Sequence, residues 1–273
     1  ILGLFFLFSA SNSDASMVSK QLVFIVAGFI MMILISQPDP DIFRRMSLLF
    51  LLLSIMLLGI TYLFGPEING AQRWVRVGSF SFQSSELLKL AVPVFLANFL
   101  FGKKLPIQRK EIFFSLVIIF CCFFLVYRQP DLGTALIVAL SGLFVLFLSG
   151  LSWSFIGGSF MILVISSPFI WNILLAPFQR QRIATFFNPD ADPFGASWNI
   201  IQSKVAIGSG GFFGKGFGEG SQTQLNFLPE TETDFIFSVI GEEFGFLGSI
   251  VLILFYALLI YRIIRIGFSS RSF

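Results

Sequence analysis

The sequence predicts an all-α fold, a polytopic bundle of transmembrane helices, on the strength of three observations. Hydrophobic residues make up 56% of the 273 residues, and the mean hydropathy is +0.88. Charged residues make up only 12%, against about 25% in soluble domains. Apolar runs of about 17–25 residues, the length that crosses a bilayer, recur along the chain. A soluble protein of this size could not bury so much apolar surface, so lipid is the expected solvent.

Each apolar run is expected to be a helix, because lipid offers no hydrogen-bond partner to an unpaired backbone group. The eight expected runs are 1–10, 20–36, 46–64, 86–102, 112–127, 132–149, 155–175 and 235–261. The first is interpreted as the tail of a span, and both ends of the chain look cut. A long polar stretch, 176–234, separates the last two runs. The whole chain, 1–273, is expected to form one membrane domain.

The Lys and Arg residues of the short loops predict the orientation of the helices. One set of loops carries nine of the 18 basic residues, among them Arg44, Lys103 and Arg262. The opposite set carries four, among them Arg128. The richer side is expected to be cytoplasmic, which places the 176–234 loop on the outer face.

Composition excludes several kinds of chemistry. The chain has no histidine, so histidine bases, Ser–His and Cys–His catalysis and histidine metal sites are all excluded. Acid–base chemistry therefore falls to carboxylates, lysine or tyrosine. The two cysteines, Cys121 and Cys122, are adjacent in an apolar run and are interpreted as small apolar filler. The net charge of +3 is small, and no nucleic-acid partner is expected.

Glu86 and Lys89 stand at the start of the fourth run, where ionisable groups are costly and count as hypotheses about function. Their i, i+3 spacing puts them on one helical face. One interpretation is a self-neutralising pair that fixes the end of the helix. The other is a buried pair that lines a polar cavity.

The segment GAQRWVRVGSFSFQ, residues 70–83, precedes that run on the outer side. Its glycines, Gly70 and Gly78, allow tight turns. Arg73 and Arg76 suit a lipid pyrophosphate headgroup, because a guanidinium binds phosphate bidentately. The alternative is an ordinary aromatic belt with arginines that reach to the interface.

The segment RQPDLGTAL, residues 128–136, places Asp131 at the outer end of a run. Pro130 ends the preceding helix. Asp131 then lies at the start of the next helix, where its carboxylate is expected to cap free N–H groups.

The polar stretch is rich in glycine and ends in clustered carboxylates. Its run GSGGFFGKGFGEG predicts irregular backbone close to another segment, but it lacks the Gly-Lys-Ser/Thr order of a phosphate-binding loop. Glu230, Glu232 and Asp234 lie where the loop meets an apolar helix. Such a cluster suits a general base or a divalent cation. The alternative is that Thr233 or Asp234 serves as a helix N-cap.

Glu242 and Glu243 lie about two turns into the last run. Two acids inside a span are not expected to face lipid. We expect them to meet Lys89 or an arginine in the bundle.

Together these segments resemble the SEDS family of shape, elongation, division and sporulation proteins over essentially the whole chain. The motifs that carry the resemblance are GAQRW, FQSSELLKLAVP, QPDLGTAL, QRQRI, NPDADPFGASWNIIQSKVAIGSGG and FLPETETDFIFSVIGEE. Within the family, GSQTQLNFLPE is similar to the elongation branch, RodA, rather than to the division branch, FtsW.

The resemblance implies a peptidoglycan glycosyltransferase that polymerises lipid II and releases undecaprenyl pyrophosphate. It implies a helix bundle in the bacterial cytoplasmic (inner) membrane, with about eight of the family's roughly ten spans present here and the active site on the outer face. The implied partner is a class B penicillin-binding protein, a transpeptidase, within the elongation complex.

The resemblance also assigns roles to residues. The family's essential loop aspartate falls on Asp234, the expected catalytic base. The expected substrate-binding residues are Arg73, Glu86, Lys89, Asp131, Arg182, Lys204 and Glu230. A divalent cation, Mg²⁺ or Mn²⁺, is the one cofactor left open.

Three departures from the family pattern stand out. Glu232 takes the place of a histidine, a change that either alters the acidity of Asp234 or is neutral. Ser84 takes the place of a proline, and the family's last two helices are absent from this sequence. Two other functions remain open. A lipid II flippase would need a polar path through the bundle, and a non-catalytic scaffold would only recruit the elongation or division machinery.

Overall fold

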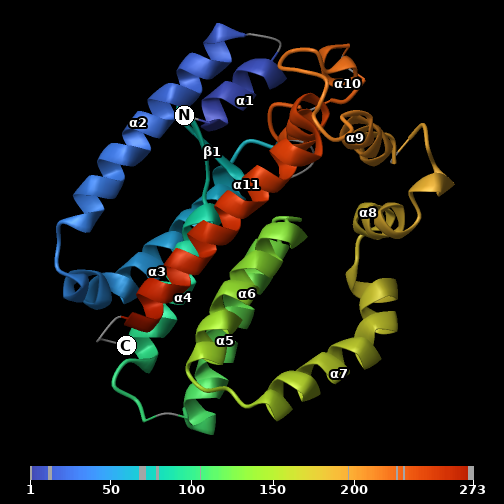
Figure 1. The fold of residues 1–273 in the computed structure, drawn as a ribbon. Coiled ribbons are helices and arrows are strands. Elements are labelled where there is room, and N and C mark those ends of the chain that lie inside the picture. The colour runs from blue at the N-terminus through green and yellow to red at the C-terminus, as the bar shows by residue number, and fades with distance from the viewer. Residues whose placement is uncertain are drawn as a thin grey trace. The chain divides into compact units, whose positions relative to one another are not determined.

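The computed structural model describes residues 2–11, 14–67, 72–77, 80–104, 106–195, 197–225, 227–229 and 231–269, and they are mostly helical (Figure 1). The helices are α1 (Leu2–Ala10), α2 (Ala15–Ser36), α3 (Pro40–Phe64), α4 (Ser85–Leu100), α5 (Arg109–Tyr127), α6 (Leu132–Leu148), α7 (Trp153–Phe169), α8 (Pro177–Phe187), α9 (Trp198–Ser209), α10 (Ser221–Gln224) and α11 (Ile236–Ser269). A π-helical turn, η1 (Ile170–Leu174), continues α7, and a 3-10 turn, η2 (Pro189–Ala191), follows α8.

Each of the eight apolar runs contains a helix, which confirms the predicted all-α class. Within the described part of the chain, five helices are long and apolar enough to cross a membrane: α2, α3, α5, α7 with η1, and α11. The apolar helix α6 is shorter, with 17 residues. The helix α4 has 16 residues and contains Pro93.

Side-chain caps fix where several helices begin. The carboxylate of Asp14 accepts the N–H of Ser16 at the start of α2, which holds the pKa of Asp14 below its ordinary value. At the start of α3, whose first residue is Pro40, the carboxylate of Asp39 accepts the N–H of Asp41. Proline suits this position because its missing N–H would have no partner there.

The chain divides into two compact units, and Pro38–Ile173 forms one of them. In this unit α4 packs against α3 and α6, and α5 packs against α6. The contact between α5 and α6 is close at Gly142, where an added Cβ would lie 2.6 Å from a side-chain atom of Ile119. The core of the unit is aliphatic and centres on Leu88, Leu96 and Leu146, whose side chains are fully buried.

A small β-hairpin precedes α4, in a segment for which no strand was expected. Strands β1 (Trp74–Val77) and β2 (Phe80–Gln83) pair antiparallel, with Trp74 opposite Gln83. The turns expected at Gly70 and Gly78 lie outside the described residues. The open end of the hairpin pairs Trp74 with Gln83, next to the start of α4 at Ser85.

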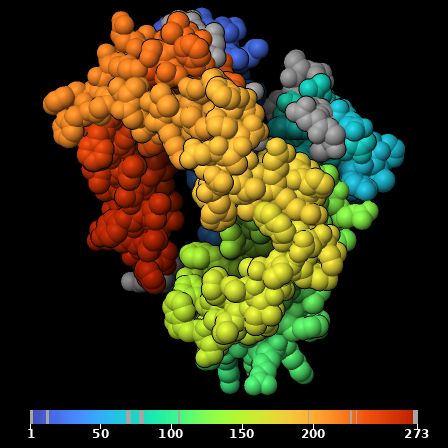
Figure 2. Space-filling model, turned by 90° about the vertical axis from the view of Figure 1, so that its right-hand side faces the viewer, coloured from blue at the N-terminus to red at the C-terminus, as the bar shows by residue number. Residues whose placement is uncertain are grey.

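The other unit comprises residues 1–37 and 174–272. The polar stretch 176–234 is not a single extended loop, because it folds into α8, η2, α9 and α10. Helix α9 packs along α11, and α1 contacts both α2 and α11. Figure 2 shows the orange α9–α10 segment lying on the red α11.

Candidate functional site

The last helix, α11, is broken at Gly245, which has φ 64° and ψ −158°. The glycine-rich loop after α9 satisfies the backbone groups freed by the break. The N–H groups of Lys215 and Gly216 donate to the carbonyls of Glu242 and Glu243, both at 3.0 Å. Beyond the break, Phe246 and Leu247 donate to carbonyls of the same loop. Interrupted helices are tolerated at membrane depth where protein covers the break, and they often mark binding sites in transporters.

Glycine is required where the loop meets the helix. At Gly214, with φ +84°, an added Cβ would lie 2.1 Å from the carbonyl oxygen of Glu243. At Gly245 it would lie 2.3 Å from the backbone nitrogen of Gly214. Backbone therefore contacts backbone here, as the irregular course predicted for the glycine-rich run requires.

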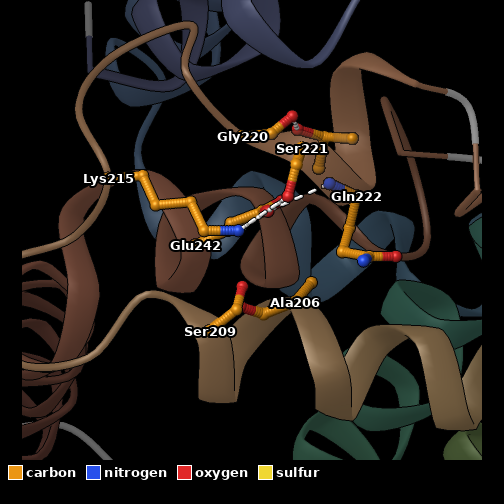
Figure 3. A network of polar contacts seen from close by, with 8 residues as sticks. Ala206, Ser209, Lys215, Gly220, Ser221, Gln222 and Glu242 are labelled. Carbon is orange, nitrogen blue, oxygen red and sulfur yellow. Dashed lines mark hydrogen bonds and ion pairs between the residues drawn. The ribbon is translucent and has the colours of Figure 1, made fainter.

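Glu242, a buried carboxylate, is the centre of a polar network (Figure 3), which we call the Glu242 network: Lys215, Ser221, Gln222 and Glu242. One oxygen of Glu242, Oε1, accepts from Lys215 Nζ at 2.6 Å, from the N–H of Gln222 at 3.0 Å and from Ser221 Oγ at 3.2 Å. The side chain of Glu242 is fully buried, whereas that of Lys215 is 27% exposed. The network joins α11 to the start of α10.

Glu243 points to a different neighbour, the first helix. Its Oε1 accepts from Ser9 Oγ at 2.5 Å. The expectation that Glu242 and Glu243 meet Lys89 or an arginine is therefore wrong. Glu242 pairs with Lys215, and Glu243 is held by a serine, because the loop and α1 supply donors that hydropathy cannot reveal.

The end of α1 also supports the turn that carries Asp234. Gln224 Nε2 donates to the carbonyl of Ser9 at 3.4 Å, and Thr231 Oγ1 donates to the carbonyl of Ala10 at 3.1 Å. These carbonyls belong to the last turn of α1, which has no partner for them within the helix. The buried Thr231 thus ties the start of the 231–235 turn to α1.

Asp234 itself is exposed in that turn, two residues before α11 begins at Ile236. It accepts no hydrogen bond and forms no ion pair with any residue that the structure describes. The neighbouring Glu232 is partly exposed, and Glu230 lies outside the described residues. The carboxylate of Asp234 is therefore open to a ligand and is not occupied as a helix cap.

Arg73 lies in the Pro38–Ile173 unit and holds the turn before α6. Its Nε donates to the carbonyl of Gln129 at 3.0 Å, and its Nη2 donates to that of Pro130 at 2.6 Å. Two of its donor groups are thus engaged with backbone. Its Nη1 has no partner among the described residues and is left for a further acceptor.

Asp131 caps α6, as predicted from its position after Pro130. Its Oδ1 accepts the N–H of Thr134 at 3.1 Å, and its Oδ2 accepts Gln83 Nε2 at 2.8 Å. Both oxygens are engaged, one with the helix and one with the hairpin. The hairpin, the 128–131 turn and α6 are therefore joined by polar contacts.

Glu86 and Lys89 form the predicted i, i+3 pair, with Lys89 Nζ 2.6 Å from Glu86 Oε2. Their side chains are 45% and 27% exposed, so the pair is not buried. Ser84, just before α4, makes no side-chain cap bond. The geometry fits a pair at the end of a helix, with Lys89 accessible to an anionic ligand.

The remaining predicted residues lie on the short helices of the polar stretch. Arg182 is exposed on α8, and Lys204 is exposed on α9. Across the described ranges, no group of three or more Asp, Glu, His or Cys side chains is placed to hold a metal ion.

Sequence reasoning missed the partners of the two buried acids: Lys215, Ser221, Gln222 and Ser9. One signal pointed to them, because two adjacent acids within an apolar helix need donors nearby. Lys215, the one lysine of the glycine-rich run, had been given no role and was therefore a candidate partner for these acids.

The fold defines the class of this protein, a multi-pass helical membrane protein. Two of its carboxylates form ion pairs with lysines, one at the start of a helix and one at the break in another. Over residues 1–273 the chain matches the FTSW_RODA_SPOVE family, described as cell cycle proteins, and it belongs to that family.

Similar proteins carry more specific names. The chain is 44% identical over 256 residues to the peptidoglycan glycosyltransferase MrdB of Escherichia coli (strain K12), covering 94% of this chain and 69% of that protein. Its fold matches a structure of a peptidoglycan synthase complex that coordinates polymerization and crosslinking, with a TM-score of 0.83, 28% identity, and coverage of 99% and 75%. It also matches the rod shape determining protein RodA of Thermus thermophilus, with a TM-score of 0.70, 25% identity, and coverage of 99% and 72%.

Proposed function

We propose that this protein is a peptidoglycan glycosyltransferase that polymerises lipid II into glycan strands, with Asp234 as its catalytic base. The observation that carries the proposal is the state of Asp234, an exposed carboxylate beside a membrane helix that no described residue engages. A general base needs this combination, a fixed backbone and a carboxylate free to accept a proton. Membership of a family whose relative MrdB is named a peptidoglycan glycosyltransferase supports the reaction class.

The proposed reaction joins two lipid-linked disaccharides. Asp234 accepts the proton of the acceptor's 4-hydroxyl, and that oxygen forms a bond to the anomeric carbon of the donor. The bond between this carbon and the donor's pyrophosphate oxygen breaks, and undecaprenyl pyrophosphate leaves with the electron pair. The proton on Asp234 then passes to water. Inversion at an α-linked donor yields the β-1,4 bond.

Cationic groups stabilise the departing pyrophosphate in this proposal. Arg73 contributes through Nη1, because its other donors already hold Gln129 and Pro130. Lys89 contributes while it stays paired with Glu86, and the exposed Arg182 and Lys204 attract the lipid headgroup. Charge stabilisation of this kind is worth several kcal/mol in a site that excludes water.

The site is proposed to face the outer side of the cytoplasmic membrane. The distribution of Lys and Arg in the short loops supports this orientation. The partner is a class B penicillin-binding protein, since a structural neighbour is a synthase complex that couples polymerization to crosslinking. The likeness to a rod shape determining protein favours a role in elongation. A divalent cation, Mg²⁺ or Mn²⁺, would share the stabilising role of Arg73 and Lys89 by neutralising charge on the pyrophosphate.

The deciding experiment is glycan polymerisation from purified lipid II by the full-length protein with its transpeptidase partner. Wild-type protein is expected to make glycan, and folded Asp234→Ala protein is expected to make none. Equal product from both would remove Asp234 from the mechanism. No product from either protein would favour a flippase or a scaffold. A scaffold would also retain growth and complex formation in the Asp234→Ala variant.

A further inference from the structure

An ion pair that the proposed chemistry does not use lies at the break in α11. The side chain of Glu242 is fully buried, and the cation paired with it is Lys215 of the glycine-rich loop. The other oxygen of Glu242, Oε2, is buried and has no partner among the described residues. A buried carboxylate depends strongly on its partner, because removal of the partner leaves an uncompensated charge.

The Glu242 network fixes the start of α10. Ser221 and Gln222 are the first two residues of that helix, and both donate to Glu242 Oε1, through the Ser221 hydroxyl and the Gln222 backbone N–H. The carbonyl of Gln222 in turn accepts the N–H of Leu228 at 3.3 Å, and the side chain of Leu228 is buried. A hydrogen bond therefore links the network to Leu228, three residues before the 231–235 turn.

The C-terminal end of the 231–235 turn continues into α11, the helix that carries Glu242. Asp234 lies eight residues before Glu242, and α11 begins between them at Ile236. The ion pair thus joins the two ends of the segment from Lys215 to Glu242, and Asp234 lies within that segment. Thr231, bonded to the end of α1, is the other fixed point.

We infer that Lys215 and Glu242 are positioning residues that set the place of the Asp234 carboxylate. The inference rests on the proposed function and adds residues that act through Asp234 without touching the sugar. Lys215 is the more exposed end of the pair. Its loss removes the side-chain contacts with Glu242 and Ser221 at the start of α10, while the backbone bonds between the loop and α11 remain. A displacement of about 1 Å at a catalytic group lowers turnover by as much as a hundredfold.

The test compares variants of the full-length protein with its partner, in the lipid II assay and per folded molecule. Lys215→Met and Glu242→Gln are each expected to lower kcat roughly 10- to 100-fold with KM for lipid II almost unchanged. Lys215→Arg keeps the charge and is expected to restore most of kcat. Combining Lys215→Met with Glu242→Gln is expected to be no worse than either single change, because the two residues act as one pair.

Two controls separate positioning from general damage. Lys103, whose side chain is 47% exposed, pairs with Glu111 at 3.9 Å in the other unit, and Lys103→Met is expected to keep wild-type kcat. Hydrogen exchange of the amides of 221–235 is expected to quicken in Lys215→Met, while exchange in 246–260 stays unchanged. If either single variant fails to fold, Ser221→Ala removes one donor, keeps the ion pair and is expected to lower kcat a few-fold.

Several results would overturn the inference. The first is a wild-type kcat per folded molecule in the single variants, or in Ser221→Ala where that variant replaces them. The second is a failure of Lys215→Arg to restore kcat. The third is unchanged hydrogen exchange of the amides of 221–235 in Lys215→Met. If wild-type protein makes no glycan, the proposed function fails, and the exchange measurement alone then decides whether the pair fixes the Asp234 segment. If Asp234→Asn abolishes product while Lys215→Met is fully active, only the positioning inference fails.

Discussion

Asp131 and Asp234 each stand just before an apolar helix, and the structure uses them in opposite ways. Asp131 directly precedes α6, and both of its oxygens accept hydrogen bonds, one from Thr134 and one from Gln83. Asp234 precedes α11 by two residues, is exposed, and has no partner among the described residues. The first carboxylate stabilises local structure, whereas the second is held by its backbone and left free to accept a proton.

The largest expected effect comes from the same substitution at the two aspartates. Asparagine caps a helix as well as aspartate does, but its amide cannot act as a base. Asp234→Asn is therefore expected to lower glycan synthesis by roughly 10²- to 10⁴-fold with an unchanged unfolding temperature. Asp131→Asn is expected to keep the cap and to lower glycan synthesis by less than about tenfold, the factor that corresponds to the loss of one hydrogen bond. Both are measured as glycan formed per folded molecule.

Equal losses at the two positions would break the comparison, since Asp131 would then act in the chemistry as well. Equal activity of Asp234→Asn and wild-type protein would instead leave the exposed carboxylate without a role.

This contrast also shows what the sequence could and could not predict. The cap at Asp131 was predictable because Pro130 and the apolar run that follows it mark a helix start locally. The partner of Glu242 was not, since Lys215 lies 27 residues earlier and reaches it only through the course of the glycine-rich loop. Hydropathy located α11 as a run but gave no sign of the break at Gly245, because a glycine inside an apolar run looks like any other small residue.

The next largest effect is expected where the glycine-rich loop packs on the broken helix α11, in the unit that carries Asp234. In Gly214→Ala, the new Cβ would meet the carbonyl of Glu243, and the residue would be held at φ +84°. The expected loss is about 2–5 kcal/mol of unfolding free energy, from backbone strain and overpacking together. Gly218→Ala is the matched control, because it has φ +73° and no atom within 4 Å of its Cβ.

Gly218→Ala is therefore expected to lose only about 1–2 kcal/mol, the strain alone. Thermal unfolding in detergent measures the difference between the two variants. Equal losses at Gly214 and Gly218 would mean that the close approach of loop and helix does not contribute to stability.

A smaller effect is expected at Arg73, which supports the Asp131 side of the comparison. Arg73→Gln removes the two charge-assisted hydrogen bonds to Gln129 and Pro130 and is expected to destabilise the protein by about 1.5–3 kcal/mol. Arg73→Lys keeps the charge but not the fork of donors, so it should recover only part of that loss. Arg76 lies in strand β1 and is exposed, and Arg76→Gln is expected to change stability by no more than about 0.5 kcal/mol. A matching loss at Arg76 would show that net charge, and not the two carbonyl contacts, accounts for the effect.

The smallest expected effect tests the cap itself. Asp131→Ala leaves the N–H of Thr134 and the amide of Gln83 without their acceptor, and it is expected to lower the unfolding free energy by about 1 kcal/mol. Asp234→Ala removes no contact with a described residue and is expected to leave stability unchanged. Thermal unfolding of the two variants side by side gives the difference. A loss of stability in Asp234→Ala as large as that in Asp131→Ala would mean that Asp234 also supports its own turn, and an activity defect at Asp234 could then arise from structure as well as from proton transfer.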